Sequence, residues 1–272
     1  MNQLLIDWIM EHQNKTHKQA KSLLTKEQIL VNGKPQTKYN YLVKETDHIV
    51  IKKAIETEKW DIPILYEDSN IIVVNKPSGL LTIGTEKEKE NTLYNVMSSY
   101  LKTKQKQAKI FIVHRLDKDT SGVVLLAKSE RIKALYQDHW EDIVKYRGYI
   151  ALIEGTLNKK EDIITVYLEE NKQYQMYVSK SGKKAITKYK VLKENKNYSK
   201  LEIELLTGRK NQIRITFSHI GHPILGDEKY GAKKIPSLKL GLHAHKLILI
   251  DPITKKELVF EAPIPQQFNK FI

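Results

Sequence analysis

Short apolar runs, paired on either side of turn-forming residues, recur through most of this 272-residue chain. Residues 64–66 and 71–74 flank four turn formers, a pattern typical of a β-hairpin. The same arrangement returns around residues 195–197 and again near the C-terminus. Apolar residues with helical spacing follow two capping residues, Thr92 and Ser129. Helices scattered among mostly antiparallel strands predict an α+β fold.

The N-terminal part differs from the rest and is predicted to form a separate small α/β domain. Thr16 can cap the second of two short helices, and Asn32-Gly33 is a strong tight-turn signal before a short β run. The polar stretch from Glu56 to Asp61 is typical of a linker, so we expect domains at residues 1–55 and 60–272. The small lysine-rich domain suits either RNA binding or a structural appendage of the larger domain.

The charge balance favours a polyanionic partner. Lysine and arginine number 46 against 32 aspartate and glutamate residues, a formal charge of +14, and each neutralised phosphate would release counterions. The chain has no cysteine, which excludes disulfides, thiolate nucleophiles and cysteine-ligated metal sites. No basic segment opens the chain as in a signal peptide, and no apolar run approaches the roughly 18 residues of a membrane span. We therefore expect a cytoplasmic protein without membrane attachment.

The most informative segment is the polar stretch from His114 to Gly122, between apolar runs at 110–113 and 123–127. Two core strands would hold such a loop rigidly, which is a common way to place a catalytic group. The stretch offers a carboxylate at Asp117, a guanidinium at Arg115 and several turn formers. A structural loop, whose Asp and Thr side chains satisfy backbone amides, is the open alternative.

Residues 114–128, HRLDKDTSGVVLLAK, resemble the signature of the RluA-type pseudouridine synthase family. Four further segments resemble the other motifs of that family, in the same order: VVNKPSGL at 73–80, YRGYIALIEG at 146–155, GRKNQIRITFSHIGHPILGDEKYG at 208–231 and the stretch at 242–265. The resemblance covers residues 60–272 and implies the fold of that family, a mixed, mainly antiparallel sheet with flanking helices. The N-terminal part, with VNGKPQTKYNYLVKETDHIVI, resembles an S4 RNA-binding domain.

The resemblance assigns catalytic roles to three residues. Asp117 matches the catalytic aspartate, Tyr149 the active-site tyrosine, and Arg214 the basic residue that pairs with the aspartate. Tyr146 is a nearby competitor for the tyrosine, but the phrase GYIALIEG favours Tyr149.

Basic residues in the same motifs are expected to contact RNA: Lys76, His114, Arg115, Arg209 and Lys210. Arg115 matches the arginine that would hold the RNA or fill the space of the flipped base. The chain departs from the family pattern in one place, because Lys210 and Asn211 precede Gln212 where the family usually has histidine. The departure bears on substrate detail more than on activity.

The reaction implied by the resemblance needs a carboxylate and little else. Pseudouridine formation breaks the N1–C1′ bond of a uridine, turns the uracil, and joins C5 to C1′. No redox step and no hydrolytic water are involved, so neither a cofactor nor a metal is expected. The carboxylate acts either as a nucleophile or as the base that removes a sugar proton, and a neighbouring arginine favours its charged form. The target base must leave its stack to reach the carboxylate.

Two other functions stay open at this stage. One is an inactive RNA-binding protein of the same fold, and the other is a hydrolase of nucleosides or sugars that pairs Asp117 with Asp119. His243 and His245 are a weak metal signal, for which packing is the favoured explanation. The prediction is a monomeric RNA-modifying isomerase that acts on specific uridines in ribosomal or transfer RNA.

Overall fold

The computed structural model describes residues 3–25, 27–51, 60–86 and 88–272. The chain divides into two compact units, Met1–Lys59 and Trp60–Ile272. Most of the predicted linker falls outside the described residues, because 56–59 are not among them. None of the helices in the described ranges is long and apolar enough to cross a membrane.

The first unit packs two helices against short strands, as predicted. Its elements are β1 (Gln3–Leu4), α1 (Leu5–Gln13), α2 (His17–Thr25), β2 (Ile29–Val31), β3 (Lys34–Pro35), β4 (Leu42–Val43) and β5 (Ile49–Ile51). At the start of α2, the Thr16 hydroxyl accepts from the Gln19 amide at 3.4 Å and the Gln19 side chain accepts from the Thr16 amide at 2.9 Å. Asn32 and Gly33 both have positive φ, 51° and 79°, and form the tight turn between β2 and β3.

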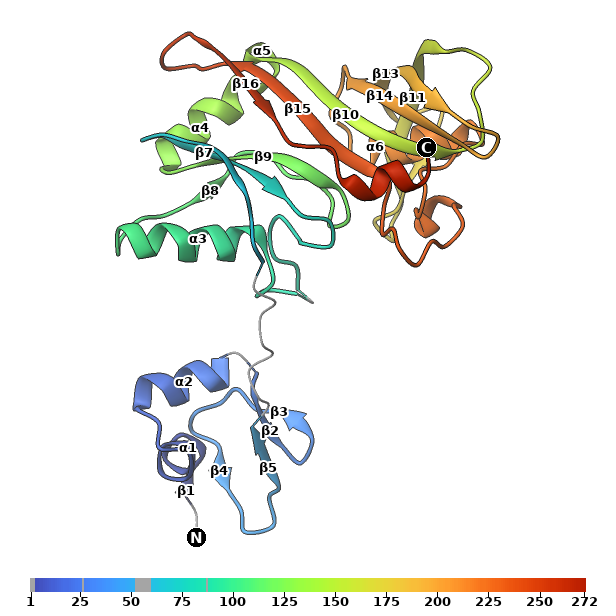
Figure 1. Ribbon diagram of the computed structural model, residues 1–272. Helices are drawn as coiled ribbons and strands as arrows, with labels where there is room; N and C mark the ends of the chain where they lie inside the picture. Colours follow the sequence, from blue (N-terminus) through green and yellow to red (C-terminus); the bar gives the residue numbers. More distant parts are fainter. Residues whose placement is uncertain (1–2, 26, 52–59, 87) are drawn as a thin grey trace. The chain divides into compact units, whose positions relative to one another are not determined.

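One eleven-stranded sheet organises the second unit (Figure 1). Its strands are β6 (Ile64–Glu67), β7 (Ile71–Lys76), β8 (Phe111–Ile112), β9 (Ser121–Ala127), β10 (Val144–Glu154), β11 (Glu161–Glu170), β12 (Met176–Val178), β13 (Lys183–Glu194), β14 (Tyr198–Leu205), β15 (Leu242–Ile250) and β16 (Glu257–Glu261). They are ordered β12-β11-β13-β14-β10-β15-β9-β7-β6, with β8 beside β9 and β16 beside β15. Only the pairing of β15 with β9 is parallel among the strand pairs that the structure describes. This mixed, mainly antiparallel sheet with flanking helices is the predicted α+β fold.

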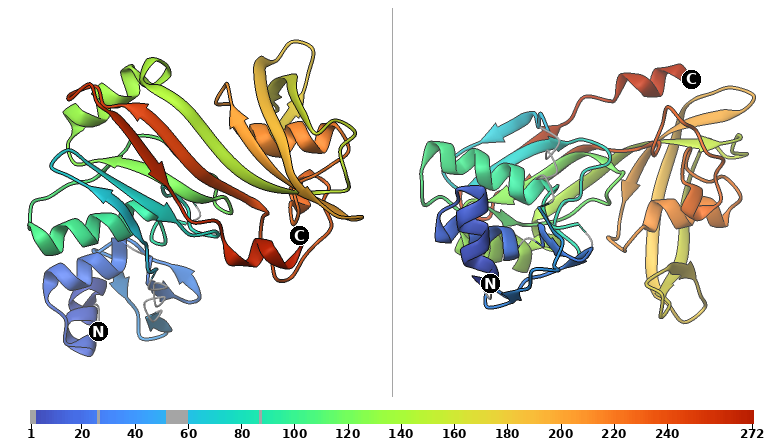
Figure 2. Two further views of the ribbon diagram at one scale, coloured as in Figure 1. Left: turned by 45° about the horizontal axis from the view of Figure 1, so that its top comes forward. Right: turned by 90° about the horizontal axis from the view of Figure 1, so that it is seen from below.

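Two helices, α3 (Leu93–Lys104) and α4 (Glu130–Asp138), cover opposite faces of β7 and β9 (Figure 2). Successive side chains of a strand point to opposite faces. Accordingly, Val73 belongs to a buried cluster with Ile132 of α4, and its neighbour Val74 belongs to another with Met97 of α3. Both faces of β7 and β9 are therefore buried, and each strand contains a continuous apolar run, at residues 71–74 and 123–127.

Capping side chains begin α3 and α4 where the sequence predicts. The Thr92 hydroxyl accepts from the amide of Asn95 at 3.1 Å, and the Ser129 hydroxyl accepts from the amide of Ile132 at 3.3 Å. The other helical elements are α5 (Trp140–Ile143), α6 (Gln212–His219) and the 3-10 turns η1 (Glu228–Tyr230) and η2 (Gln266–Lys270). Helix α6 covers the part of the sheet built from β10, β11, β13 and β14.

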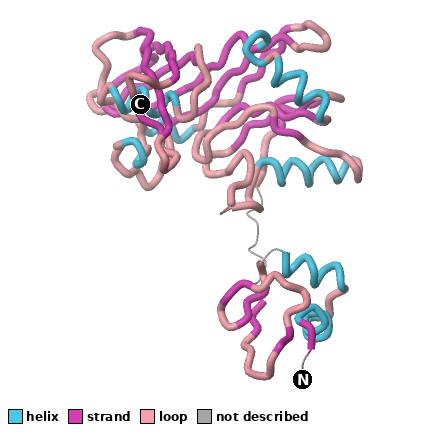
Figure 3. The backbone as a smooth tube through the Cα atoms, turned by 180° about the vertical axis from the view of Figure 1, so that it is seen from behind, coloured by secondary structure: helices cyan, strands magenta, loops and turns pink. Residues whose placement is uncertain are grey.

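Strands β10 and β15 run from one half of the second unit to the other (Figures 1 and 3). Ala244 of β15 pairs with Tyr149 of β10 on one side and with Gly122 of β9 on the other. Gly122 has φ 117°, and a Cβ there would lie 2.1 Å from the carbonyl oxygen of Ala244, so this close approach requires glycine. With this register, β15 alone separates Tyr149 of β10 from the loop that precedes β9.

Candidate active site

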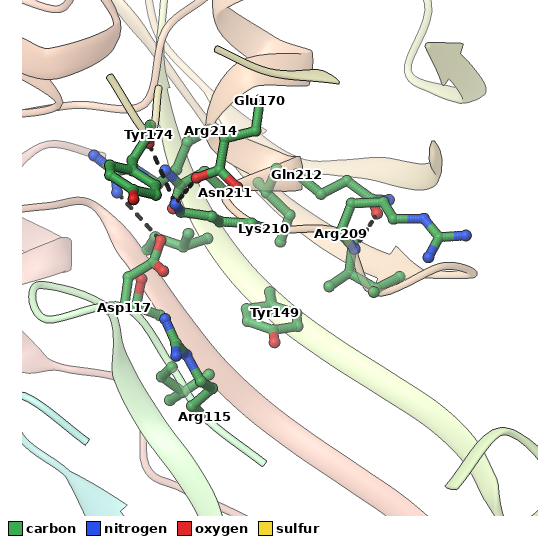
Figure 4. Close-up of a pocket in the computed structure, with 16 residues that line it drawn as sticks. Arg115, Asp117, Tyr149, Glu170, Tyr174, Arg209, Lys210, Asn211, Gln212 and Arg214 are labelled. Carbon is green, nitrogen blue, oxygen red and sulfur yellow. Dashed lines mark hydrogen bonds and ion pairs between the residues drawn. The ribbon is translucent and has the colours of Figure 1, made fainter. Parts of the chain in front are cut away.

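A cavity of about 560 Å³ opens where the loop before β9, strand β10 and the start of α6 come together (Figure 4). The predicted catalytic residues Asp117, Tyr149 and Arg214 all line it, although 97 positions separate the aspartate from the arginine. Its other lining residues are Arg115, Leu116, Thr120, Glu170, Tyr174, Leu205, Gly208, Arg209, Lys210, Asn211, Gln212, Ile213 and Leu242.

Side chains from the segment after β7 fix the loop that carries Asp117. The Thr82 hydroxyl forms two hydrogen bonds with the backbone of Leu116: it donates to the carbonyl at 2.8 Å and accepts from the amide at 3.2 Å. The Ser78 hydroxyl donates to the carbonyl of Asp119 at 2.7 Å. Asp117 therefore lies between two anchored residues, and 32% of its side chain remains exposed at the cavity.

Lys76 belongs to this internal support. Its side chain is fully buried, and its ammonium donates to the carbonyls of Pro77, Leu80 and Lys118 at 3.0, 2.8 and 3.0 Å. Burial lowers the pKa of Lys76 to about 7, against the charges of two nearby carboxylates, which raise it. A buried amino group that is shared among three carbonyls is not presented to an RNA phosphate, so the position of Lys76 does not support the RNA contact predicted for it.

Arg214 lies in the first turn of α6, which the buried Gln212 anchors to β13 through a 3.0 Å hydrogen bond to the Thr187 hydroxyl. The Arg214 Nε and Nη2 atoms each donate to Asp227 at 2.7 Å, and Nη1 donates to Asp117 at 3.1 Å. Burial acts to lower the pKa of Arg214, but the hydrogen bonds and charges of Asp227 and then Asp117 raise it above its usual value. The guanidinium therefore stays charged and joins the two carboxylates.

Asn211 and Tyr230 complete a closed set of contacts around this charge pair. The neighbours of the Asn211 amide assign its nitrogen to the side of Asp117, because the opposite orientation would place two acceptors together. In this orientation the amide donates to the two carboxylate oxygens of Asp117 at 2.6 and 3.1 Å, and its oxygen accepts from the Tyr230 hydroxyl at 2.7 Å. The Tyr230 ring lies 4.9 Å from the Arg214 guanidinium, within range of a cation–π interaction. Asn211 has φ 54°, a left-handed conformation that asparagine adopts more readily than most residues. Two donors thus position Asp117, and Tyr230 contacts both.

Tyr149 presents a half-buried ring to the cavity from β10. Burial raises the pKa of Tyr149 to about 12, while the charge of Arg147 lowers it and that of Asp117 raises it. The phenol therefore keeps its proton at neutral pH. Tyr146, the competing tyrosine, does not line the cavity and donates to Glu202 at 3.3 Å, so geometry favours Tyr149.

A model of the family described as RNA pseudouridylate synthase matches residues 70–219, more than half of the chain. The chain belongs to this family. An uncharacterized RNA pseudouridine synthase of Mycoplasma pneumoniae is 35% identical over 258 residues, 89% of this chain and 82% of that protein. Ribosomal large subunit pseudouridine synthase D of Zymomonas mobilis is 35% identical over 242 residues, 82% of this chain and 76% of that protein. A solved structure of human RNA pseudouridylate synthase domain containing 4 has a TM-score of 0.63 at 26% identity and covers 76% of this chain and 90% of that one.

Family membership confirms the resemblance drawn from the sequence motifs. An RNA pseudouridine synthase is an isomerase, and this excludes the paired-carboxylate hydrolase as the assignment. None of these relatives supports the inactive RNA-binding alternative.

Three of the basic residues predicted to contact RNA line the cavity of the synthase. Arg115 and Arg209 are exposed there. Lys210 forms a salt bridge with Glu170 and donates to the carbonyl of Tyr174 at 3.2 Å, so its ammonium is held beside the loop between β11 and β12. These positions are open to an RNA strand, and the RNA contact itself stays a prediction.

His114 has a different environment. Its Nε2 atom accepts from the amide of Leu125 at 3.1 Å, and its ring lies 5.0 Å from that of Trp140. Burial, and then the charge of Arg147, lower the pKa of His114 to about 4, so the imidazole is neutral. These contacts make it a support of the catalytic loop, and its predicted RNA contact gains nothing from its position.

Several site residues were not predicted from the sequence. Asn211, Asp227 and Tyr230 lie inside the third motif at 208–231, and a closer look at the polar residues of GDEKYG could have suggested two of them. Glu170 and Tyr174 come from a hairpin that carries no motif. Only the fold reveals that these two line the cavity.

The weak histidine signal has a structural explanation. His243 is buried, with Nδ1 at 2.8 Å from the Ser121 hydroxyl, and His245 has Nδ1 at 2.7 Å from the carbonyl of Ala262. In the part of the chain that the structure describes, no three His, Asp or Glu side chains gather as a metal site would require.

Proposed function

We propose that this synthase isomerises a uridine in ribosomal RNA of the large subunit, with Asp117 as the catalytic residue. The observation that carries the proposal is the position of the Asp117 carboxylate, exposed at the cavity and hydrogen-bonded by Arg214 at 3.1 Å and by Asn211 at 2.6 Å. A charged group that is held in this way is oriented before the substrate arrives.

Two uses of the carboxylate are compatible with this geometry. Asp117 either attacks C1′ and displaces the uracil from N1, or removes the C2′ proton so that the base departs and a glycal forms. In both routes the uracil turns and C5 bonds to C1′. In the first route this step breaks the bond between C1′ and the Asp117 carboxylate, and in the second Asp117 returns the proton to C2′. The C5 proton is then lost and N1 gains one, so the composition of the nucleotide is unchanged and no oxidant, reductant or water is consumed.

Arg214 and Tyr149 have distinct roles in this proposal. Arg214 supports the negative charge of Asp117, because its guanidinium is fixed by Asp227 and stays protonated. Tyr149 offers its ring for stacking on the flipped uracil. Its protonated hydroxyl is suited to donate a hydrogen bond to the base, and it would have to lose that proton before it could accept one from C5.

The substrate class rests on relatives, since the name of the Zymomonas mobilis enzyme refers to the large ribosomal subunit. A relative of Escherichia coli with the same name is 31% identical over 273 residues. Ribosomal RNA is accordingly the first substrate to test, and transfer RNA is the second. A cytoplasmic monomer, as expected from the sequence, is part of the proposal.

The first unit, Met1–Lys59, is proposed to be an S4-like RNA-binding module. Two helices against a short antiparallel sheet, with exposed lysines such as Lys18, Lys21, Lys34 and Lys38, support this assignment. The module would add phosphate contacts beyond those of the catalytic cavity.

The experiment that tests the function is a pseudouridine map of RNA from a strain that lacks the gene. One or more pseudouridines of large-subunit ribosomal RNA should be missing and should return with the wild-type gene, but not with Asp117→Asn. A missing site only in transfer RNA would overturn the substrate assignment. Unchanged maps of both RNAs would contradict the proposed activity in the cell.

A further inference from the structure

Arg147 lies on β10 and forms none of the contacts that position Asp117. It precedes Tyr149 by two residues on β10, and the alternation of side chains along a strand places both on one face. Its side chain is half-buried. Its Nη1 atom lies 2.7 Å from the point where a Cβ of Gly208 would be, so the guanidinium fills the space that this glycine leaves open.

Two neighbours of this guanidinium belong to the site. Gly208, the first residue of the third motif, lines the cavity and lies against the guanidinium, and Tyr149 follows Arg147 by two residues on β10. The positive charge of Arg147 acts on two side chains: after burial it is the next cause of the lowered pKa of His114, and it opposes the raised pKa of Tyr149. Arg147 does not itself line the cavity, but its guanidinium lies against Gly208, which does, so Arg147 is placed beside the path of the RNA into the cavity.

Within the part of the chain that the structure describes, no group neutralises Arg147. Among the described residues it has no salt bridge and no hydrogen-bond acceptor, whereas Arg214 is joined to two carboxylates. A charge that is partly removed from water gains stability from a counter-charge. The nearby chain offers further positive charge instead, from Arg115 and Arg209 at the cavity. A guanidinium in such a setting suits an anion from outside the protein.

We infer that Arg147 binds a backbone phosphate of the RNA at the target uridine or within two nucleotides of it. The inference rests on the proposed function, because only an RNA substrate brings a phosphate to this position. The planar guanidinium can donate two parallel hydrogen bonds to one phosphate, which would fix the ribose relative to Asp117 as well as add affinity. The phosphate contact would be a binding interaction that positions the nucleotide, without a part in bond making.

The test combines protein variants with single neutral phosphates. The probe is a synthetic RNA centred on the uridine that the deletion map identifies, with one methylphosphonate placed in turn at each of the nearby linkages. Wild type, Arg147→Gln, Arg147→Lys and the charge-matched control Arg131→Gln, an exposed residue of α4, are compared by kcat and KM. Circular dichroism checks the fold of each protein. Activity of the wild type on the unmodified RNA tests the proposed function separately.

We expect a single linkage whose phosphate binds Arg147. A methylphosphonate there should lower kcat/KM of wild type and Arg131→Gln by about tenfold or more, the size expected for the removal of a hydrogen bond to a charged group. Arg147→Gln should show that decrease on unmodified RNA and no further decrease with the methylphosphonate, while Arg147→Lys should keep part of the sensitivity. The inference would be overturned if a folded Arg147→Gln protein kept the wild-type sensitivity at every linkage. If Arg147→Gln does not fold, the inference would be overturned if Arg147→Lys were as sensitive as wild type at every linkage.

Discussion

Asn211 occupies the position where the usual family pattern has histidine, and in this chain its amide donates to the Asp117 carboxylate. An imidazole would change its charge near neutral pH, whereas an amide does not titrate. The contact between Asn211 and Asp117 is therefore the same across the physiological pH range. Tyr230 orients the amide by donating to its oxygen.

This contact predicts the pH behaviour of Asn211→Asp. The substitution places a second carboxylate within hydrogen-bond distance of Asp117, and two adjacent carboxylates tend to share one proton. Like charge disfavours ionisation, so the acid side of the kcat–pH profile should move to higher pH, with a decrease of about tenfold or more near pH 6. Asn195→Asp, in the exposed turn between β13 and β14, is the control. A folded Asn211→Asp with the wild-type profile would show that the two side chains do not interact in solution.

At the scale of elements, the last residue of β7 and the segment that follows it support the catalytic loop. Lys76, Ser78 and Thr82 each bond to backbone groups of residues 116–119. The motif VVNKPSGL thus supports the loop that carries Asp117 rather than contributing to the cavity surface.

Lys76→Met tests whether this residue supports the catalytic loop. Removal of the amino group leaves the carbonyls of Pro77, Leu80 and Lys118 with fewer donors, so the free energy of unfolding should fall by about 1–3 kcal/mol at pH 10, where the cost of removing the proton from Lys76 is small. The folded-state pKa of Lys76 is lowered to about 7 and the unfolded value is near 10.4, so the unfolded state binds more protons between these values. Wild-type stability should therefore rise relative to the variant from pH 7 to about 10. Urea unfolding measures the free energy of unfolding and its pH dependence, with Lys102→Met, at an exposed position, as control. Equal stability of the two variants would contradict the supporting role.

Local signals predicted the elements that depend on nearby residues. The caps at Thr92 and Ser129, the hairpin of β6 and β7 and the turn at Asn32-Gly33 were all predicted correctly. The strand expected at 110–113 is shorter, because only Phe111–Ile112 pairs with β9. Strand β11 was not predicted, since its exposed Ile163 and Tyr167 disturb the alternation of polar and apolar residues.

Some residues of the candidate site could likewise be predicted from the sequence, and others could not. The motif residues Asp117, Tyr149 and Arg214 could be predicted from the resemblance alone. The contacts that position them could not, because they depend on distant segments that meet only in the folded sheet. Lys76 shows the converse, since a basic residue in a motif was predicted to bind RNA and is buried instead.

At the scale of the whole molecule, the two units predict two separable contributions to RNA binding. The second unit has its own buried clusters, so a protein that lacks residues 1–59 should stay folded. Its RNA affinity should fall by about tenfold or more, and the slope of log affinity against log salt should decrease by about 0.7–0.9 for each phosphate that the protein no longer neutralises. Filter binding over a salt series measures both. A truncated protein that binds and modifies RNA like the full chain would contradict the RNA-binding role of the first unit.

The central claim is that Asp117 performs the chemistry, and the most direct measurement is tritium release from C5-labelled uridine in substrate RNA. Asp117→Asn keeps the shape of the side chain and removes its charge, so release should fall at least about a hundredfold while RNA binding persists. Asp119→Asn, two residues away, should retain most of its activity, and circular dichroism confirms the fold of both. A folded Asp117→Asn protein that releases tritium at the wild-type rate would contradict the account.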